Sequence, residues 1–279
     1  MIEGQFSRTA LTAAGFRAAH QLAEGGAVFC DPLAARVMGD DLAPYLEHCA
    51  APALRPLRLF VALRSRIAED VARRAIARGA RQVVTLGAGL DTFACRVPPL
   101  AGLAAYEVDH PATQAEKRRR LAAAAIEAPA LRFCPCDFER EALGDALAAA
   151  GFDAGARGAF LWLGVTPYLT REAVEATLRC VAGLTGGADI VFDYANPPDS
   201  VDSPGHRLFQ ERMAARVAAQ GEAFRSYFDT AELRRLLLSI GFTGVEDFGP
   251  RDIALRFAPA SAPPPENGGH ILHAFFPPR

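Results

Sequence analysis

The stretch Val83–Thr92 constrains the fold of this chain more than any other. An apolar run, Val83–Leu86, ends in Gly87-Ala88-Gly89, and a second apolar run ends near the acidic residues Glu107 and Asp109. Glycines after a short apolar run are typical of the strand–turn–helix of a nucleotide-binding βαβ unit, because they permit a tight turn and a close approach of backbone to ligand. We therefore expect the chain to be built around such a unit.

Short apolar runs alternate with helical patterns from Gln82 onward. The candidate strands are 82–86, 103–108, 131–134, 158–163, 188–193, 243–247 and 270–276, and the helical patterns lie at 112–126, 139–150, 171–185 and 229–240. Strands that alternate with helices form a mainly parallel sheet with helices on both faces. This pattern predicts an α/β fold: a Rossmann-like domain over 79–279 with a seven-stranded, mostly parallel sheet.

Two further segments predict coverings for this sheet. Residues 1–78 are rich in helical patterns, broken by prolines, and are expected to form a helical N-terminal extension or lid. Residues 196–228 interrupt the alternation after a strand's carboxyl end, where open α/β sheets bind ligands, so they are expected to belong to a substrate cover. The proline-rich residues 258–268 are predicted to be a loop or hairpin insertion.

Charge and hydropathy exclude several classes of function. The formal net charge is −2, so the chain lacks the excess of positive charge that is typical of a nucleic-acid-binding protein. No apolar run approaches the roughly 20 residues of a membrane span, and the N-terminus lacks the apolar core of a signal peptide. We expect a cytoplasmic protein without nucleic-acid or membrane partners. The basic run Lys117–Arg120 is predicted to be a solvated helix face over an anion site.

The six cysteines predict free thiols and no metal site. Cys30, Cys49, Cys95 and Cys180 are isolated in apolar surroundings. Cys134 and Cys136 are spaced too tightly for the usual zinc pattern, and no histidine is close to them. Buried, unpaired thiols are the expected state.

The glycine turn also indicates which cofactor it suits. A dinucleotide fingerprint has a third glycine where this chain has Thr92, and Asp91 puts a negative charge where a helix N-terminus would bind a pyrophosphate. A nucleoside ligand without phosphate fits better, and S-adenosylmethionine is such a ligand. Asp109 falls where a ribose-binding acid belongs and can accept hydrogen bonds from both ribose hydroxyls. The alternative is a solvated loop acid.

Asp137 and Phe138 follow the third predicted strand. Asp137 can accept a hydrogen bond from the adenine amine, or it can cap the helix expected at 139–150. Phe138 can cover the adenine ring, or it can belong to the core. The residues alone leave both pairs of alternatives open.

An ordered set of segments now resembles the leucine carboxyl methyltransferase-like group of class I S-adenosylmethionine-dependent methyltransferases. The segments run from near residue 7 to beyond 250 and are Ser7–Ala10, Asp31–Ala34, Arg64–Arg66, Leu86–Thr92, Tyr106–Pro111, Trp162–Leu169 and Phe224–Asp229, the last leading into Leu233 and Gly241-Phe242. The resemblance implies that the chain is an enzyme with S-adenosylmethionine as its cofactor.

The resemblance implies a role for each matching position. Arg64 matches the arginine that pairs with the cofactor's carboxylate, a task that suits the guanidinium fork. The loop Gly87-Ala88-Gly89 lies under the cofactor, Asp109 matches the ribose acid, and Asp137 with Phe138 matches the adenine end. Arg17 lies where the N-terminal extension of such enzymes can approach the cofactor.

Two departures from the family affect the expected substrate. Phe93 and Leu163 stand where many relatives have an arginine and a glutamate. They favour the bacterial members that methylate small molecules of secondary metabolism, such as polyketide carboxyl or phenol O-methyltransferases. We expect a small-molecule acceptor with a carboxylate. A protein C-terminal carboxyl methyltransferase, a phenol O-methyltransferase and a non-catalytic S-adenosylmethionine-binding protein are the alternatives.

No clear catalytic base is visible, and this favours an acceptor that is already ionised. A phenol with a pKa of about 10 would benefit from a base, whereas a carboxylate needs none at neutral pH. Tyr168 lies where the acceptor should meet the methyl group and can orient an acceptor oxygen or simply pack. His110 is interpreted as structural. The unranked candidates are His206, His270 and His273 as bases, Asp193-Tyr194 at the same sheet edge, and Arg96, Arg225 or Arg251 as the acceptor's partner.

Overall fold

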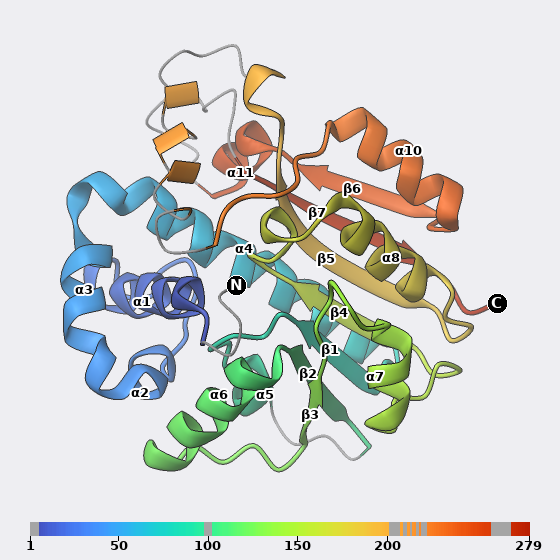
Figure 1. Cartoon of the computed structure of the whole chain (residues 1–279), viewed down its shortest axis with the longest axis horizontal. Helices are drawn as coiled ribbons and strands as arrows, with labels where there is room; N and C mark the ends of the chain where they lie inside the picture. The colour runs from blue at the N-terminus through green and yellow to red at the C-terminus, as the bar shows by residue number, and fades with distance from the viewer. Residues whose placement is uncertain are drawn as a thin grey trace.

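Seven strands form one sheet in the order β3-β2-β1-β4-β5-β7-β6 (Figure 1). A computed structural model describes residues 6–97, 102–200, 222–257 and 269–279, with 207–208, 211–212, 214–215 and 218 between them. β1 to β5 pair in parallel, and β7 runs antiparallel to β5 and β6. The strands are β1 (Gln82–Leu86), β2 (Ala104–Asp109), β3 (Leu131–Pro135), β4 (Gly158–Trp162), β5 (Ala188–Ala195), β6 (Gly244–Phe248) and β7 (Gly269–Phe276). The predicted seven-stranded, mostly parallel sheet is confirmed.

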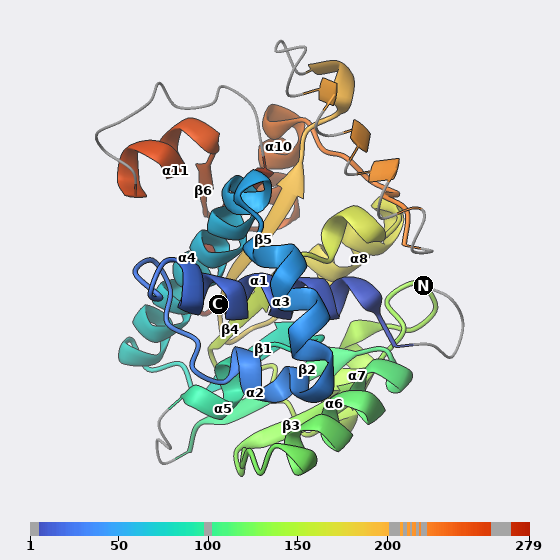
Figure 2. The ribbon, with the colours of Figure 1, turned by 90° about the vertical axis from the view of Figure 1, so that its left-hand side faces the viewer.

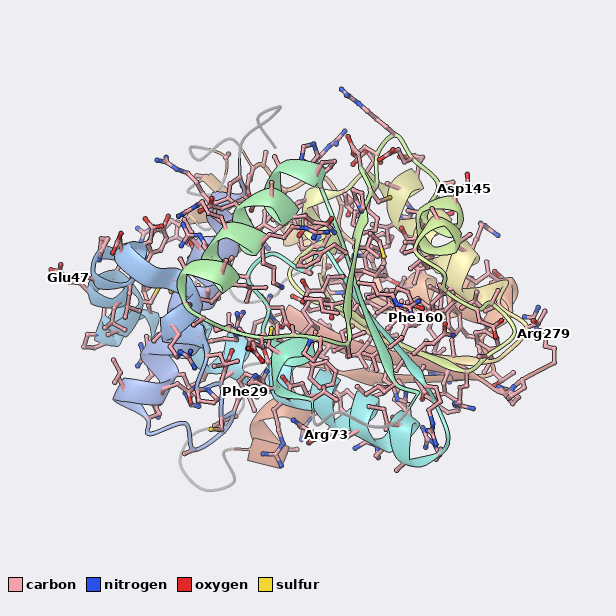
Figure 3. All side chains as sticks on the ribbon, turned by 90° about the horizontal axis from the view of Figure 1, so that it is seen from below. Phe29, Glu47, Arg73, Asp145, Phe160 and Arg279 are labelled. Carbon is pink, nitrogen blue, oxygen red and sulfur yellow. The ribbon has the colours of Figure 1, made fainter. Side chains whose placement is uncertain are left out.

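Helices cover both faces of this sheet because successive strand side chains point to opposite faces. Val84, Phe160 and Ile190 pack on one side with α7 (Leu143–Ala149), α8 (Arg171–Ala182) and α10 (Thr230–Ile240). Val83 and Val191 pack on the other side with α4 (Arg55–Ala77), α5 (Phe93–Arg96) and α11 (Pro250–Phe257), and α6 (Pro111–Ala123) lies beside β3. Figure 3 shows Phe160 in the middle of the packed layers, with Glu47 and Asp145 at the outside.

The N-terminal helices lie across the carboxyl ends of the parallel strands (Figure 2). They are α1 (Arg8–Ala23), α2 (Ala34–Met38) and α3 (Leu42–Ala50), with 3₁₀ turns at Gly39–Asp41 and Pro52–Leu54. Ser7 caps α1 by accepting a hydrogen bond from the N–H of Ala10. The predicted helical character of this region is confirmed, whereas its role as a separate lid stays a prediction.

A buried ionic network fastens these helices to the glycine turn. The Arg17 guanidinium donates to the carboxylate of Asp31 at 2.9 Å, and the Thr92 hydroxyl donates to the same carboxylate at 2.6 Å. Arg96 donates to the Thr92 hydroxyl at 2.9 Å and pairs with Glu69 on α4. Each buried charge therefore has a partner of opposite sign, which offsets the cost of removing it from water.

The interpretation of Lys117–Arg120 as a solvated face over an anion site was wrong for two of its four residues. Lys117 is buried and its ammonium lies 2.6 Å from the carboxylate of Glu107. Arg120 is also buried, donates to the carbonyl of Met38 at 2.7 Å and pairs with Asp41. Both residues face the protein because α6 packs against the sheet and α2.

All six cysteines are free, as predicted. Their predicted burial holds for Cys49, Cys134 and Cys136, whereas Cys95 and Cys180 are half-buried and Cys30 is exposed.

Among the described residues, no helix combines the length and the apolar character that a membrane span requires. Within the same part of the chain, no cluster of histidine, cysteine, aspartate or glutamate side chains could hold a metal ion. The interval 258–268, His206 and most of 201–221 lie outside the described residues.

Candidate functional site

A cavity of about 630 Å³ lies at the carboxyl ends of β1, β2 and β4, beneath α1. Its wall includes all of the predicted cofactor-binding residues and the tyrosine expected to orient the acceptor: Arg64, Gly87, Ala88, Gly89, Asp109, Asp137, Phe138 and Tyr168. Arg17, His110 and Arg225 also line it. The fold therefore brings together residues that are up to about a hundred positions apart, although their individual roles stay predictions.

The glycine loop turns back from β1 in a conformation that side chains disfavour. Gly87 and Gly89 have φ values of 61° and 48°. The Gly87 N–H donates to the Val108 carbonyl at 2.7 Å, which pins the loop to β2. A Cβ at Gly87 would lie 2.3 Å from a methyl carbon of Val165, so glycine also lets the loop pass beneath the segment that follows β4. The turn is thus shaped from both sides of the cavity.

Asp109 is fixed at the end of β2 by two backbone donors. Its Oδ2 accepts from the Gly89 N–H at 2.6 Å, and its Oδ1 accepts from the His110 N–H at 2.7 Å. Burial raises the pKa of Asp109 above its ordinary value, and these two hydrogen bonds oppose the shift. Each carboxylate oxygen has a second lone pair, so the group can still accept hydrogen bonds from a diol in the cavity.

Asp91 lines the cavity just before the N-terminus of α5, where a dinucleotide-binding turn would be expected to hold a phosphate. Its carboxylate accepts from the Phe93 N–H at 2.7 Å, at the start of α5. α5 has only four residues, so its helix macrodipole is small. The geometry agrees with the inference that this turn does not suit a pyrophosphate.

Arg64 extends from α4 to the cavity wall beside the segment that follows β4. One guanidinium nitrogen donates to Oδ2 of Asp193 at 2.8 Å. The remaining N–H groups make no hydrogen bond with the described residues, and the side chain is 13% exposed. A guanidinium with an open edge on a cavity can receive a carboxylate.

The opposite end of the cavity carries Asp137 and Phe138. The Asp137 carboxylate accepts from the Glu139 N–H at 3.0 Å, within a turn that precedes α7. The predicted helix start at 139 was therefore wrong: α7 begins at Leu143, and Asp137 caps the turn instead of a helix. Phe138 packs against the core, 6.5 Å from the Trp162 ring, and it also lines the cavity.

Tyr168 lies near Arg64, and its hydroxyl has no hydrogen-bond partner among the described residues. Its ring packs edge-on against Phe224, with centroids 5.3 Å apart. Burial raises the pKa of the Tyr168 hydroxyl well above its ordinary value. The group therefore keeps its proton at neutral pH and can donate a hydrogen bond, but it cannot act as a base there.

Glu222 lies in the interval 196–228, whose role as a substrate cover stays a prediction, and it contacts the start of α1. Its carboxylate accepts from the backbone N–H of Arg8 at 3.0 Å, from the Ser7 hydroxyl at 3.2 Å, and from the Thr9 hydroxyl. Beside it, Arg225 donates to Glu139 at 2.8 Å. These contacts form the roof of the cavity, and both oxygens of the Glu222 carboxylate accept hydrogen bonds within it.

The structure corrects several candidates for the acceptor end. Arg96 pairs with Glu69 and Asp31 and does not line the cavity, and Arg251 is exposed on α11. His270 and His273 pair with acidic residues outside the cavity. His110 does line it, and its Nδ1 accepts from the Ala112 N–H, which caps α6 as the structural interpretation predicts.

Sequence reasoning missed Glu222, gave no role to Ser7 or Thr9, and named Asp193 as an unranked candidate at the sheet edge without its pairing with Arg64. Asp193 had a usable signal, because it ends a strand at the same sheet edge as Asp109. Glu222 had none, since its partners lie more than 200 positions away.

Comparisons with known proteins identify the family of this chain. Residues 10–182 match the model of the family described as leucine carboxyl methyltransferase. The chain is 38% identical over 193 residues to YktD of Bacillus subtilis, a candidate S-adenosyl-L-methionine-dependent methyltransferase, covering 68% of this chain and 63% of that protein. It is 33% identical over 165 residues to another such candidate of Mycobacterium tuberculosis, covering 59% and 55%. The alignments thus span less than two thirds of the length of these relatives.

One solved structure supports the fold. The crystal structure of a candidate O-methyltransferase from Nostoc punctiforme superposes with a TM-score of 0.50 at 11% sequence identity, over 78% of this chain and 58% of that one. At this identity the likeness concerns the architecture alone.

Proposed function

The chain belongs to the leucine carboxyl methyltransferase family, and from this premise we propose that it is an S-adenosylmethionine-dependent O-methyltransferase acting on the carboxylate of a small molecule. One observation carries the proposal: a single cavity is lined by an arginine with unpaired N–H groups, by a carboxylate held by two backbone N–H groups, and by a tyrosine hydroxyl without a partner among the described residues. These groups belong to Arg64, Asp109 and Tyr168.

The cavity fits the cofactor at several points. The Gly87–Gly89 loop offers backbone that a ligand can approach closely, and Asp109 can accept from the two ribose hydroxyls. Asp137 and Phe138 would hold the adenine, and Arg64 would pair with the carboxylate of the methionine part. When bound, the cofactor supplies the activated methyl group on its sulfonium.

The acceptor end favours an oxygen that is already ionised. Among the described residues, the one histidine on the cavity wall caps α6, and Glu222 is occupied by three donors. Tyr168 keeps its proton, so it can donate to a carboxylate and orient the attacking oxygen. Leu163, Val165 and Leu169 line the same region, and they suit the apolar body of a small organic acid.

The contribution of the protein to the reaction is orientation and exclusion of water. Holding a nucleophile at its point of attack can lower the barrier by roughly 7–11 kcal/mol. Tyr168 would fix the acceptor oxygen, and Arg64 and Asp109 would hold the methionine and ribose parts of the donor. The roof made by Ser7, Thr9 and Glu222 would cover them. No proton has to move when the acceptor is a carboxylate.

Incubation with methyl-labelled S-adenosylmethionine and a panel of small organic acids and phenols tests this function. A carboxyl methyl ester releases its label as volatile methanol in mild alkali, whereas a phenol methyl ether retains it. We expect alkali-labile label on a small acid. Alkali-stable label contradicts the carboxylate, label on a polypeptide contradicts the small-molecule acceptor, and label that stays on the cofactor with every acceptor contradicts the enzyme.

A further inference from the structure

Asp193 links the two halves of the candidate site. It is 5% exposed at the end of β5, and its carboxylate accepts from Arg64 at 2.8 Å and from the Gly164 N–H at 2.5 Å. Its backbone carbonyl accepts from the Thr166 hydroxyl at 2.5 Å. Asp193 therefore holds both an arginine of α4 and the segment that leads from β4 to Tyr168.

Gly164 makes this arrangement possible through its missing side chain. It has a φ of 70°, and a Cβ at this position would lie 2.6 Å from one terminal nitrogen of Arg64. The guanidinium therefore lies directly against the Gly164 backbone. Asp193 accepts a hydrogen bond from Nη1 of Arg64, and the backbone of Gly164 limits the space beside Nη2. The guanidinium edge that makes no hydrogen bond lies on the cavity wall.

We propose that Asp193 is a positioning residue that holds the Arg64 guanidinium against Gly164, so that its open edge can bind the carboxylate of the cofactor's methionine part. An arginine side chain that is fixed before binding loses less conformational freedom when it binds, which strengthens the contact. The inference rests on the proposed function. It adds that the methionine end and the acceptor segment 164–168 are held by the same carboxylate.

Two ligands separate this role from a general contribution to the fold. S-adenosylhomocysteine has the amino-acid carboxylate, whereas 5′-methylthioadenosine has the same nucleoside part without it. In Asp193→Asn the amide can still accept from Gly164, but it turns a donor toward Arg64. Loss of a hydrogen bond between charged groups predicts about 10- to 100-fold weaker binding of S-adenosylhomocysteine by calorimetry. Binding of 5′-methylthioadenosine should stay unchanged.

Asp189→Asn is the matched control. Asp189 is also a buried carboxylate on the same strand, but its partners Arg78, Arg157 and His273 lie outside the cavity wall. This variant should not change the ratio of the two affinities, even if it lowers the free energy of unfolding. Gly164→Ala provides a second test, because its Cβ crowds the guanidinium while the Asp193 carboxylate is kept. Alanine is also strained at the φ of 70°, so the readout is the ratio of the two affinities, and binding of S-adenosylhomocysteine should weaken selectively.

The outcomes distinguish this inference from the proposed function. Wild-type protein that binds neither ligand overturns the proposed function and the inference together. If the wild type binds both ligands and the folded Asp193→Asn protein keeps the same affinity ratio, only the role of Asp193 is overturned. If Asp193→Asn does not fold, Gly164→Ala decides: an unchanged ratio overturns the inference, and a selective loss supports it.

Discussion

The carboxylate of Asp109 accepts a hydrogen bond from the backbone N–H of Gly89, 2.6 Å away and 20 residues earlier in the chain. This bond ties the end of β2 to the glycine loop on the side that faces the cavity. The same carboxylate thus shapes the loop and remains able to accept from a ligand.

We expect Asp109→Ala to abolish detectable binding of S-adenosylmethionine, because it removes the acceptor for the ribose hydroxyls and loosens the Gly89 loop. The fold should survive, since the substitution leaves the core strands intact. Calorimetric titration measures the affinity, and circular dichroism with thermal unfolding provides the control for folding. An affinity equal to that of the wild type would remove Asp109 from the site.

Tyr168→Phe should slow methyl transfer without weakening the binding of the cofactor. The ring still packs on Phe224, so the affinity for the cofactor should stay the same. A hydrogen bond of about 1.5 kcal/mol to a charged acceptor corresponds to a loss of about tenfold in the rate of methyl transfer. Single-turnover measurements with a saturating acid test this. A variant that transfers at the wild-type rate would show that Tyr168 only packs.

NAD should not bind, even at millimolar concentration. The Asp91 carboxylate already accepts from the Phe93 N–H, and a pyrophosphate would have to lie beside that charge. Titration of NAD followed by fluorescence or calorimetry measures this, with S-adenosylhomocysteine as the positive control. Saturable binding of NAD would restore the dinucleotide interpretation of the glycine turn.

Because Glu107 and Lys117 form a buried pair, we expect the loss of unfolding free energy on mutation of Lys117 to depend on pH. Burial raises the pKa of Glu107 from 4.5 to about 7, with Lys117 opposing the shift. Because the folded protein binds this proton more tightly than the unfolded chain, the contribution of Glu107 to stability falls as pH rises from 4.5 toward 7 and is constant above. Above that range Glu107 is ionised and depends on Lys117.

Lys117→Met should therefore lower the free energy of unfolding by about 3 kcal/mol near pH 8, because it leaves a buried charge without its partner. Near pH 5 the cost should be smaller, since Glu107 is then protonated in the folded state. Urea unfolding at the two pH values measures both costs. The double variant Glu107→Gln/Lys117→Met should recover most of the loss near pH 8, and equal costs at both pH values would contradict the explanation.

Much of the fold could be predicted from the sequence because its signals are local. The Gly87–Gly89 turn, the strand that precedes it and the acid that ends β2 all lie between Gln82 and Asp109. Alternation of apolar runs with helical patterns then placed all seven strands to within two residues at either end. The start of α7 was missed, because the turn after β3 is stabilised by side chains of Asp137 and Glu141 rather than by helix periodicity.

The roles of charged residues were less predictable, as Arg64 and Arg96 illustrate. Both are arginines that follow apolar residues, and both were candidates for contact with a ligand. The structure gives Arg96 two carboxylate partners away from the cavity and leaves Arg64 with an open edge on it. Lys117 shows the same limit, because a basic run predicted to be solvated contains a residue that is 1% exposed.

The sequence by itself determined the family resemblance, the parallel sheet and the place of the glycine turn, since backbone preference and hydrophobic period act between near neighbours. Only the tertiary structure decided which charges meet. Arg64 and Asp193 are 129 residues apart, and Ser7 and Glu222 are 215 apart. Such pairs form where packing brings surfaces together, and the free energy of each depends on the burial and geometry that packing creates.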